Sequence, residues 1–119
     1  MVDLTINFNQ RMNLWMRLGT VKVPSLREAA TYIRILEKIR PQENEMNDVQ
    51  YKTTETGIQY RLPNSNYGIK SIELENEECD AFIDGLMNHT EPVRVDDADW
   101  MMKLINSLES QRDGAKLHA

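Results

Sequence analysis

The stretch "SIELENEECDAFID", residues 71–84, decides the fold because it joins a strand pattern directly to a helix pattern. Ile72 and Leu74 alternate with polar residues, which predicts a strand with one buried face over residues 69–74. From residue 75 or 76 onward the apolar residues recur at helical spacing, at Cys79, Phe82, Ile83, Leu86 and Met87. The junction therefore predicts a helix that turns one apolar stripe toward a small sheet.

The same stretch carries six carboxylates, namely Glu73, Glu75, Glu77, Glu78, Asp80 and Asp84. A metal or acid–base site would need these groups to converge, whereas their positions splay apart along a strand and a helix, and the pattern of a calcium-binding loop is absent. Negative charge at the start of a helix is favourable by about 0.3–1 kcal/mol for each group, because the exposed N–H groups and the helix dipole attract it. We interpret the run as a solvated helix start that presents an acidic face.

Upstream of this junction, the chain begins with an alternating segment. "VDLTINF", residues 2–8, predicts a short half-buried strand. Asn7 or Asn9 can cap a helix that ends near Leu18, with Gly19 as its stop. This helix is apolar around most of its circumference, which indicates deep burial or an interface.

A second helix begins at a capping box formed by Ser25 and Glu28. It is expected to end at residue 39 or 40, before Pro41. The predicted inward stripe consists of Leu26, Ala29, Ala30, Ile33, Leu36 and Ile39. The predicted outward residues are Arg27, Thr31, Arg34 and Lys38.

Residues 41–48 are expected to form a polar, mobile connection that can include one helical turn, and residues 49–63 predict a β-hairpin. In this hairpin Val49, Tyr51 and Thr53 face Ile58, Tyr60 and Leu62. Gly57 supplies the positive φ that a tight turn needs.

The last predicted helix is capped by Asp96 or Asp97. Its inward residues are Trp100, Met101, Leu104, Ile105 and Leu108. After Ser110 the apolar period is lost, so we expect a flexible C-terminal tail over residues 111–119. The whole pattern predicts a single α+β domain over residues 1–110, with about four helices packed on a small antiparallel sheet or hairpin.

Composition favours a soluble cytoplasmic protein. A chain of 119 residues fits one domain and can bury a core without disulfides or metals. The single cysteine fits a reducing compartment. No apolar stretch is long enough to span a bilayer, and the first residues lack the pattern of a secretory signal. We therefore expect no membrane partner.

Charge is distributed unevenly along the chain. Residues 1–40 hold seven basic and three acidic side chains, a sum of +4, whereas the remainder holds seven basic and sixteen acidic ones, a sum of −9. Such asymmetry can mark a nucleic-acid face, or it can mean that the two parts attract each other, within a chain or between copies. The net charge of −5 favours attraction, because the overall field repels phosphate.

Residues capable of catalysis are few. Cys79 lies on a predicted apolar stripe, where a thiol stays protonated. His89 lies in a loop and His118 in the predicted tail, so no nucleophile–base pair and no zinc site can be assembled. Gly85 lies inside a predicted helix and can allow close packing there. We expect a protein that is not an enzyme, with no catalytic residues, no cofactor and no metal.

Nucleic-acid binding is an alternative, because a basic helix followed by a hairpin is typical of a winged helix. Its anion contacts would be Arg27, Arg34 and Lys38 on the helix, with Lys52 and Arg61 on the wing. Against this interpretation, Glu28 and Glu37 interrupt the helix, Glu55 lies at the hairpin tip, and the pI is about 5.0. We regard a nucleic-acid partner as the weaker hypothesis.

Methionine and tryptophan are frequent on the predicted helices, which suits adaptable binding surfaces as well as irregular cores. The candidates for self-association are Met12, Trp15, Met16, Trp100, Met101 and Met102. A homo-oligomer with a structural or ligand-sequestering role is therefore a further alternative.

Four stretches carry a resemblance: "LTINFNQRMNLWMRL", "LREAATYIRILEKIR", "SIELENEECDAFIDGLM" and "DADWMMKLINSLE". Their order and spacing over residues 3–109 resemble small uncharacterised accessory proteins encoded by tailed bacteriophages. The chain departs from that group at "RLGTVKVPS", where a leucine–proline turn is common, and at Tyr60, where tryptophan is common. The resemblance implies a phage origin and brings no catalytic residues with it.

Together these observations favour a non-enzymatic phage accessory protein that acts in the host cytoplasm. It would bind a host protein, such as a defence or transcription factor, and could inhibit it. The partner-binding residues would be the acidic face Glu73, Glu75, Glu77, Glu78, Asp80 and Asp84. Electrostatic attraction would mainly speed the encounter with a basic partner surface.

Overall fold

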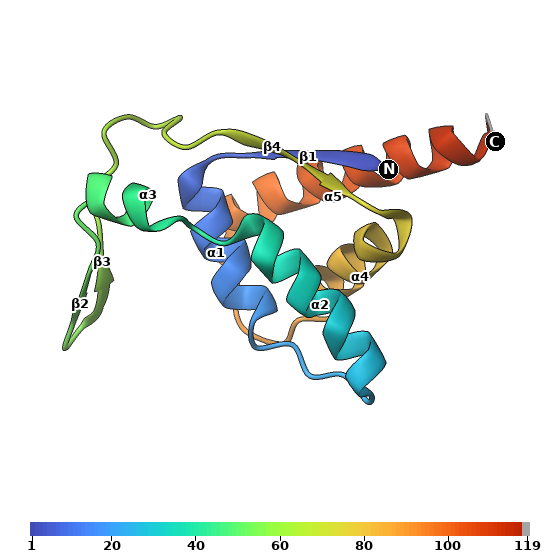
Figure 1. Ribbon diagram of the computed structural model, residues 1–119, viewed down its shortest axis with the longest axis horizontal. Coiled ribbons are helices and arrows are strands. Elements are labelled where there is room, and N and C mark those ends of the chain that lie inside the picture. The colour runs from blue at the N-terminus through green and yellow to red at the C-terminus, as the bar shows by residue number, and fades with distance from the viewer. Residues whose placement is uncertain (118–119) are drawn as a thin grey trace.

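The computed structural model describes residues 1–117, with side chains through residue 114 (Figure 1). The elements are β1 (Val2–Ile6), α1 (Phe8–Leu18), α2 (Leu26–Ile39), α3 (Glu43–Asp48), β2 (Lys52–Thr54), β3 (Gly57–Gln59), β4 (Lys70–Leu74), α4 (Asn76–Met87) and α5 (Val95–Leu117). The predicted α+β class is confirmed. There are five helices rather than about four in this part of the chain, because residues 43–48 form the short helix α3.

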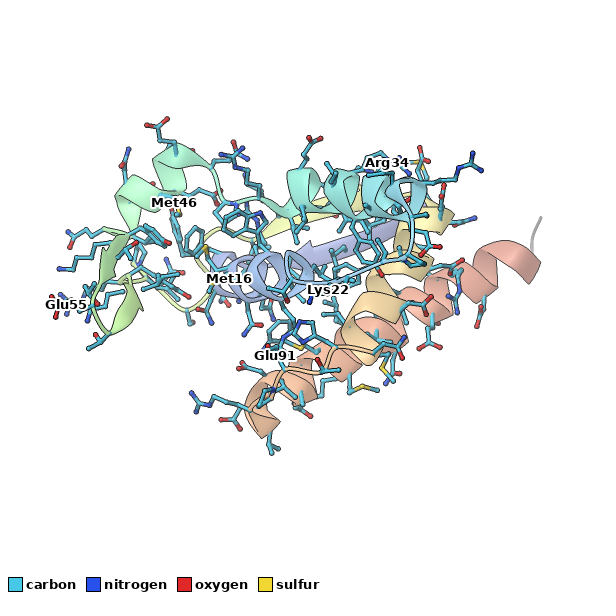
Figure 2. The ribbon with its side chains drawn as sticks, turned by 90° about the horizontal axis from the view of Figure 1, so that it is seen from below. Met16, Lys22, Arg34, Met46, Glu55 and Glu91 are labelled. Atoms are coloured by element: carbon cyan, nitrogen blue, oxygen red, sulfur yellow. The ribbon has the colours of Figure 1, made fainter. Side chains whose placement is uncertain are left out.

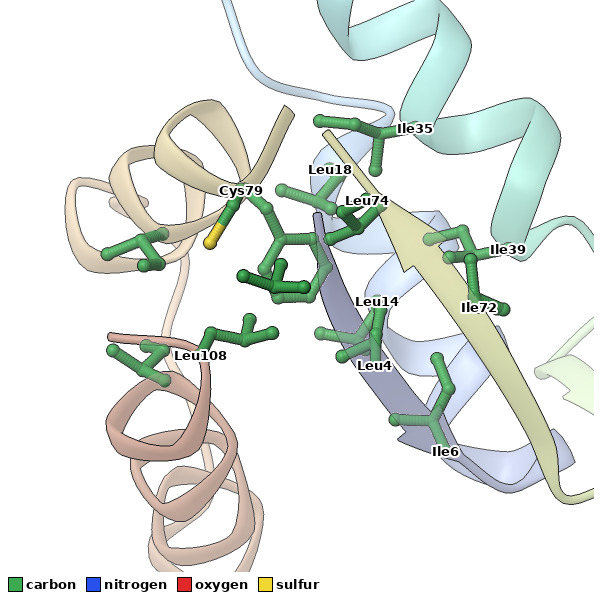
Figure 3. Packing of buried hydrophobic residues seen from close by; sticks show 14 residues of the cluster. Leu4, Ile6, Leu14, Leu18, Ile35, Ile39, Ile72, Leu74, Cys79 and Leu108 are labelled. Atoms are coloured by element: carbon green, nitrogen blue, oxygen red, sulfur yellow. The ribbon is translucent and has the colours of Figure 1, made fainter. Parts of the chain in front are cut away.

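The central sheet pairs β1 with β4 in antiparallel register, with Val2 opposite Leu74 and Leu4 opposite Ile72. Alternate residues of both strands are buried, as the sequence predicts, so one face is covered and the other meets solvent. Figure 3 shows Leu4, Leu74, Leu14 and Leu108 turned into the same space. This main core is formed by residues of β1, β4, α1, α2, α4 and α5.

The predicted bounds of the first helices are confirmed. Asn7 caps α1 and accepts a hydrogen bond from the Gln10 N–H, and the helix ends before Gly19. Ser25 caps α2 and accepts from the Glu28 N–H at 3.2 Å. Local capping chemistry therefore sets where both helices begin.

The predicted orientation of α2 is wrong in part. Leu26 and Ile33 are 90% and 55% exposed, and Ala30 is exposed too, whereas Thr31 is buried together with Ile35 and Ile39. Polar groups decide the orientation, because the Thr31 hydroxyl donates to Glu77 and the Tyr32 hydroxyl donates to the Ala81 carbonyl at 2.8 Å. Leu26, Ala30 and Ile33 therefore face solvent, whereas Ile39 of the predicted stripe is buried and Leu36 packs against the main core.

The predicted hairpin is present, with Thr53 opposite Ile58 and Gly57 at a φ of +127°. Its strands are shorter than predicted, and Val49, Tyr51, Tyr60 and Leu62 lie outside them. It projects from one end of the molecule (Figure 1). A second, smaller core joins its base to α1 and is centred on Phe8, Met12 and Val49. Tyr60 and Tyr67 pack their rings on Phe8 at centroid distances of 5.6 and 5.8 Å.

A buried ion pair links the two cores. Arg11 is 1% exposed and donates to both carboxylate oxygens of Glu45, at 2.6 and 2.9 Å. The same guanidinium donates to the Ile39 and Arg40 carbonyls at the end of α2. This arrangement holds α3 against α1 and fixes the turn between α2 and α3.

Helix α5 is longer than predicted. It begins at Val95, so Asp96 and Asp97 lie in its first turn and do not cap it. It also continues past Ser110 to Leu117, although the predicted flexibility of residues 111–119 stays a prediction. Polar contacts support the extension, because Gln111 pairs with both backbone groups of Asp3 and Arg112 donates to Asp80 at 2.6 Å.

No helix within the described residues is both long and apolar enough to cross a membrane.

Candidate functional site

A pocket of about 620 Å³ lies where the α1–α2 loop and the α4–α5 loop converge beside the seam between α2 and α4. The α1–α2 loop contributes residues 20–24, including Lys22, and the α4–α5 loop contributes residues up to Glu91. Figure 2 labels Lys22 and Glu91 at this place. The floor includes Tyr32 of α2 and Gly85 of α4. Two loops and two helices from distant parts of the sequence thus form one concave surface.

Three carboxylates line this pocket from three separate segments. Glu28 comes from α2, Asp84 from α4 and Glu91 from the α4–α5 loop, whereas Lys22 is the one lysine or arginine in the lining. Burial raises the pKa of the Tyr32 hydroxyl above its ordinary value, and the carboxylates of Asp84 and Glu28 raise it further. The lining of the pocket thus carries three carboxylates against one lysine, which is a net negative charge.

The pocket continues along the α2–α4 seam. A shallower hollow of about 270 Å³ shares Glu28, Tyr32 and Asp84 with it, and adds Glu77, Ala81, Arg27 and Thr31 to the lining. We call the two hollows together the acidic groove. Its charged lining is four carboxylates against Lys22 and Arg27.

His89 fixes one wall of the groove. Its Nδ1 accepts from the Glu91 N–H at 3.2 Å and lies 3.3 Å from Arg17 Nη1, which is a donor only. Its Nε2 therefore carries the hydrogen and donates to Thr20 Oγ1 at 2.9 Å. The Thr20 hydroxyl in turn donates a hydrogen bond to the Arg17 carbonyl. The neutral imidazole thus ties the α4–α5 loop to the end of α1.

With these hydrogen bonds His89 does not act as a general base in the acidic groove. Thr20 and His89 are close enough to form a nucleophile–base pair, which the sequence did not indicate. A base would have to accept the hydroxyl hydrogen, whereas here the imidazole donates to the hydroxyl. Since both ring nitrogens are already engaged, the geometry supports a positioning role for His89.

Part of the predicted acidic face lies in the lining of the groove. Glu77 and Asp84 line it. Glu73 and Glu75 are exposed outside its lining, and Asp80 is exposed with Arg112 as its ion-pair partner.

Glu78 does not belong to an exposed face, contrary to prediction. Its side chain is 2% exposed and accepts from Lys38 Nζ at 2.5 Å and from the Glu75 N–H at 2.9 Å. Burial alone would raise the pKa of Glu78, but the Lys38 and Glu75 hydrogen bonds and the charges of Lys38 and Arg34 outweigh it and hold that pKa below its ordinary value. Glu78 is an internal counterion that joins α4 to α2.

The predicted nucleic-acid contacts are not brought together. Arg34 and Lys38 face the acids of α4, and Arg34 lies 3.6 Å from Glu78. Lys52 and Arg61 are exposed on the hairpin. Figure 2 shows Arg34 on α2 far from the hairpin residue Glu55, which lies at one end of the molecule, so helix and hairpin do not form one basic surface.

The self-association candidates are also separated. Met12 and Met101 are 1% and 6% exposed, so their predicted place on a contact surface is wrong. The rings of Trp15 and Trp100 are half-buried against the main core. Met16 and Met102 remain exposed, on α1 and α5 respectively.

Other reactive side chains offer little chemistry. Cys79 is buried, and burial raises the pKa of its thiol, which keeps it protonated. His118 lies outside the described residues. Within residues 1–117 no group of three or more histidine, cysteine, aspartate or glutamate side chains is placed to hold a metal ion.

Sequence reasoning missed Glu28, Glu91, Lys22 and Tyr32 as groove residues. Glu28 was assigned to a helix cap, and nothing in a local pattern pairs it with Asp84, which is far along the chain. Only the packing of α2 on α4 brings these residues together.

Comparison of the chain with protein-family models, with curated proteins and with solved structures found no match.

Proposed function

We propose that this chain is a non-enzymatic binding protein that holds a basic segment of another protein in the acidic groove. The observation that carries the proposal is the convergence of Glu28, Asp84 and Glu91 on one pocket. Valines 21 and 23 and the ring of Tyr32 line the same pocket. A lysine or arginine side chain matches this mixture, because its apolar stem can pack on such residues while its charge meets carboxylates.

The electrostatics of the groove support a basic partner over an acidic one. Opposite charge on two surfaces raises the rate of encounter, and this effect weakens as salt screens the charges. A nucleic acid would meet four carboxylates along the groove and would be repelled. The phage resemblance stays a prediction, and under it the basic segment would belong to a host protein.

The experiment uses an array of short peptides rich in lysine and arginine, with glutamate-rich peptides of equal length as the reference. Binding to the 119-residue chain is measured by fluorescence anisotropy at two salt concentrations. We expect some basic peptides to bind and to weaken at high salt. The triple variant Glu28→Gln, Asp84→Asn, Glu91→Gln should reduce their affinity at least about tenfold.

Glu73→Gln is the matched control, because Glu73 is an exposed carboxylate of the sheet outside the groove lining. It should leave affinity unchanged. If the triple variant and the control bind basic peptides equally well, or if no basic peptide binds the wild-type protein, the proposal is wrong.

A further inference from the structure

The α4–α5 loop, residues 88–94, is joined to α1 by few hydrogen bonds. Residues 90–94 are all exposed, and two hollows of about 620 and 100 Å³ adjoin the loop, each lined by both His89 and Glu91. Among the described residues, three polar contacts connect the loop to the end of α1 and to Thr20, and each of them involves the side chain of Arg17 or His89. The position of the loop against α1 therefore depends on these two side chains.

The contacts of the His89 ring require its neutral form. Its Nδ1 faces two donors, the Glu91 N–H at 3.2 Å and Arg17 Nη1 at 3.3 Å, and it meets them as an acceptor. A proton on Nδ1 would remove this acceptor. It would also place a second positive charge beside the guanidinium, where like charges repel each other. Protonation of His89 is therefore incompatible with both contacts of Nδ1.

The charges around His89 come from every neighbouring segment. The charged and titratable side chains that line the two hollows are Arg17 of α1, Lys22 of the α1–α2 loop, Glu28 and Tyr32 of α2, Asp84 of α4 and Glu91 of the same loop, whereas the α5 residues of the lining are uncharged. In the described part of the chain none of the three carboxylates forms an ion pair with His89 or with Arg17. The Arg17 Nε is also buried there without a hydrogen-bond partner. The charge in direct contact with the ring is thus an uncompensated positive one.

We propose that His89 is a pH-sensitive contact, which holds the α4–α5 loop against α1 when the ring is neutral and releases it when the ring is protonated. On protonation the Glu91 N–H and the Arg17 guanidinium lose their common acceptor, and the two cations repel each other. The Nε2 hydrogen bond to Thr20 alone remains. Histidine is the side chain whose charge ordinarily changes between about pH 5 and pH 8, so the release falls in mild acid.

Release of the loop also changes the acidic groove, and this consequence rests on the proposed function. Glu91 is the one carboxylate of the larger pocket that the loop carries, whereas helices hold Glu28 and Asp84. Moving Glu91 away, and adding the charge of the imidazolium to the lining, both make the pocket less negative. A basic segment bound there would dissociate more readily in mild acid.

The experiment is nuclear magnetic resonance of the isotope-labelled 119-residue chain carrying His118→Gln, titrated from about pH 8 to about pH 5. The chain has two histidines, so this substitution leaves His89 as the one imidazole that titrates. We expect the Glu91 amide signal to shift with the same midpoint as the ring signals of His89. The heteronuclear NOE of the backbone amides between residues 88 and 94 should fall over the same range, because it reports fast local motion, while that of α4 stays constant.

Two further variants, made in the His118→Gln chain, separate charge from structure. His89→Gln is the matched control, because an amide keeps a donor and an acceptor but does not titrate in this range, so the loop signals should not respond to pH. Arg17→Met removes the positive charge beside the ring, so the His89 midpoint should move toward higher pH. A purely structural role of Arg17 would leave that midpoint unchanged. Circular dichroism near neutral pH checks that both variants are folded.

Three outcomes would overturn the proposal. They are a His89 ring that stays neutral down to about pH 5, a loop whose signals do not follow protonation of the ring, and a His89→Gln chain whose loop is released over the same pH range. Any of these contradicts the pH-sensitive contact whether or not the groove binds peptides.

Peptide binding tests the effect on the groove separately. The affinity of a basic peptide should fall at least about threefold between pH 8 and pH 5, and should fall less in His89→Gln. An equal fall in both chains would contradict the effect on the groove. If no basic peptide binds near pH 8, the proposed function is wrong, while the spectra still decide whether His89 holds the loop.

Discussion

Arg11 of α1 and Glu45 of α3 form a buried bidentate ion pair, with N–O distances of 2.6 and 2.9 Å. Lys70 of β4 adds a third charge 3.5 Å from the same carboxylate. The three charges join three elements that are distant in sequence, and the guanidinium also satisfies two carbonyls at the end of α2. It organises the region between the main core and the hairpin.

Removing one member of this pair should be costly. Glu45→Ala leaves the Arg11 charge buried without its counterion, and we expect a loss of about 3–5 kcal/mol in the free energy of unfolding. Urea denaturation followed by circular dichroism measures it. The double variant Arg11→Met, Glu45→Leu removes both charges and should lose much less. Equal losses in the two variants would contradict this account.

Stability should fall in acid because of two carboxylates. Burial alone would raise the pKa of Glu45, but hydrogen bonds from Arg11 and the Gln42 N–H and the charges of Arg11 and Lys70 hold it below its ordinary value, and the pKa of Glu78 is lowered in a similar way. A lowered folded-state pKa contributes stability that is fully present above the unfolded value of about 4.3 and is lost as the pH falls through the folded value.

The check is urea unfolding between neutral pH and about pH 3, where unfolded glutamates titrate. Glu78→Gln should be less stable at neutral pH and should lose less on acidification than the wild-type protein. Glu75→Gln, an exposed neighbour, should keep the wild-type slope. A Glu78→Gln curve parallel to the wild-type curve would show that this carboxylate does not contribute.

Gly85 should not tolerate a methyl group. Its added Cβ would lie 2.9 Å from Leu18 Cδ2 and 2.9 Å from Tyr32 Cε1, so these two side chains or the helices that carry them would have to shift. We expect Gly85→Ala to destabilise by about 1–3 kcal/mol despite the better helix propensity of alanine. Gly114→Ala in α5 is the matched control, because nothing lies within 4 Å of its Cβ, and it should stabilise by about 0.5–1 kcal/mol. Thermal unfolding of both variants shows whether each substitution raises or lowers the stability of the protein.

Helix α5 should depend on polar contacts beyond Ser110. The Gln111 side chain accepts from the Asp3 N–H at 2.7 Å and donates to the Asp3 carbonyl at 2.9 Å. Gln111→Ala should cost about 1–2 kcal/mol and speed hydrogen exchange of the Asp3 amide, since two hydrogen bonds are lost. Ser110→Ala, an exposed change one residue earlier, should do neither. If Gln111→Ala leaves the exchange rate of the Asp3 amide unchanged, contacts other than those of Gln111 protect this amide at the edge of β1.

Local patterns were enough to predict most elements. The alternation around Leu4 and Ile72 predicted the strands, and the caps at Asn7 and Ser25 predicted two helix starts, because these signals are contained within a few neighbouring residues. The class of the fold followed from their order.

Contacts between distant residues were not predictable in this way. The orientation of α2 depends on Thr31 and Tyr32 bonding to α4, and apolar counting placed Leu26 and Ile33 inward instead. Glu28 and Asp84 meet in the groove only after packing, as Arg11 and Glu45 do. A single sequence holds no signal for such pairs, since either residue alone is typical of a solvated helix.

The pairing of β1 with β4 also bears on how the chain folds. Val2 pairs with Leu74, and Ile6 pairs with Lys70, so forming this sheet requires ordering most of the intervening polypeptide. Such high contact order slows folding, because loop entropy is lost before the strand contacts compensate for it. On the ribosome β1 emerges long before its partner strand, and its backbone stays unpaired until β4 has been synthesised.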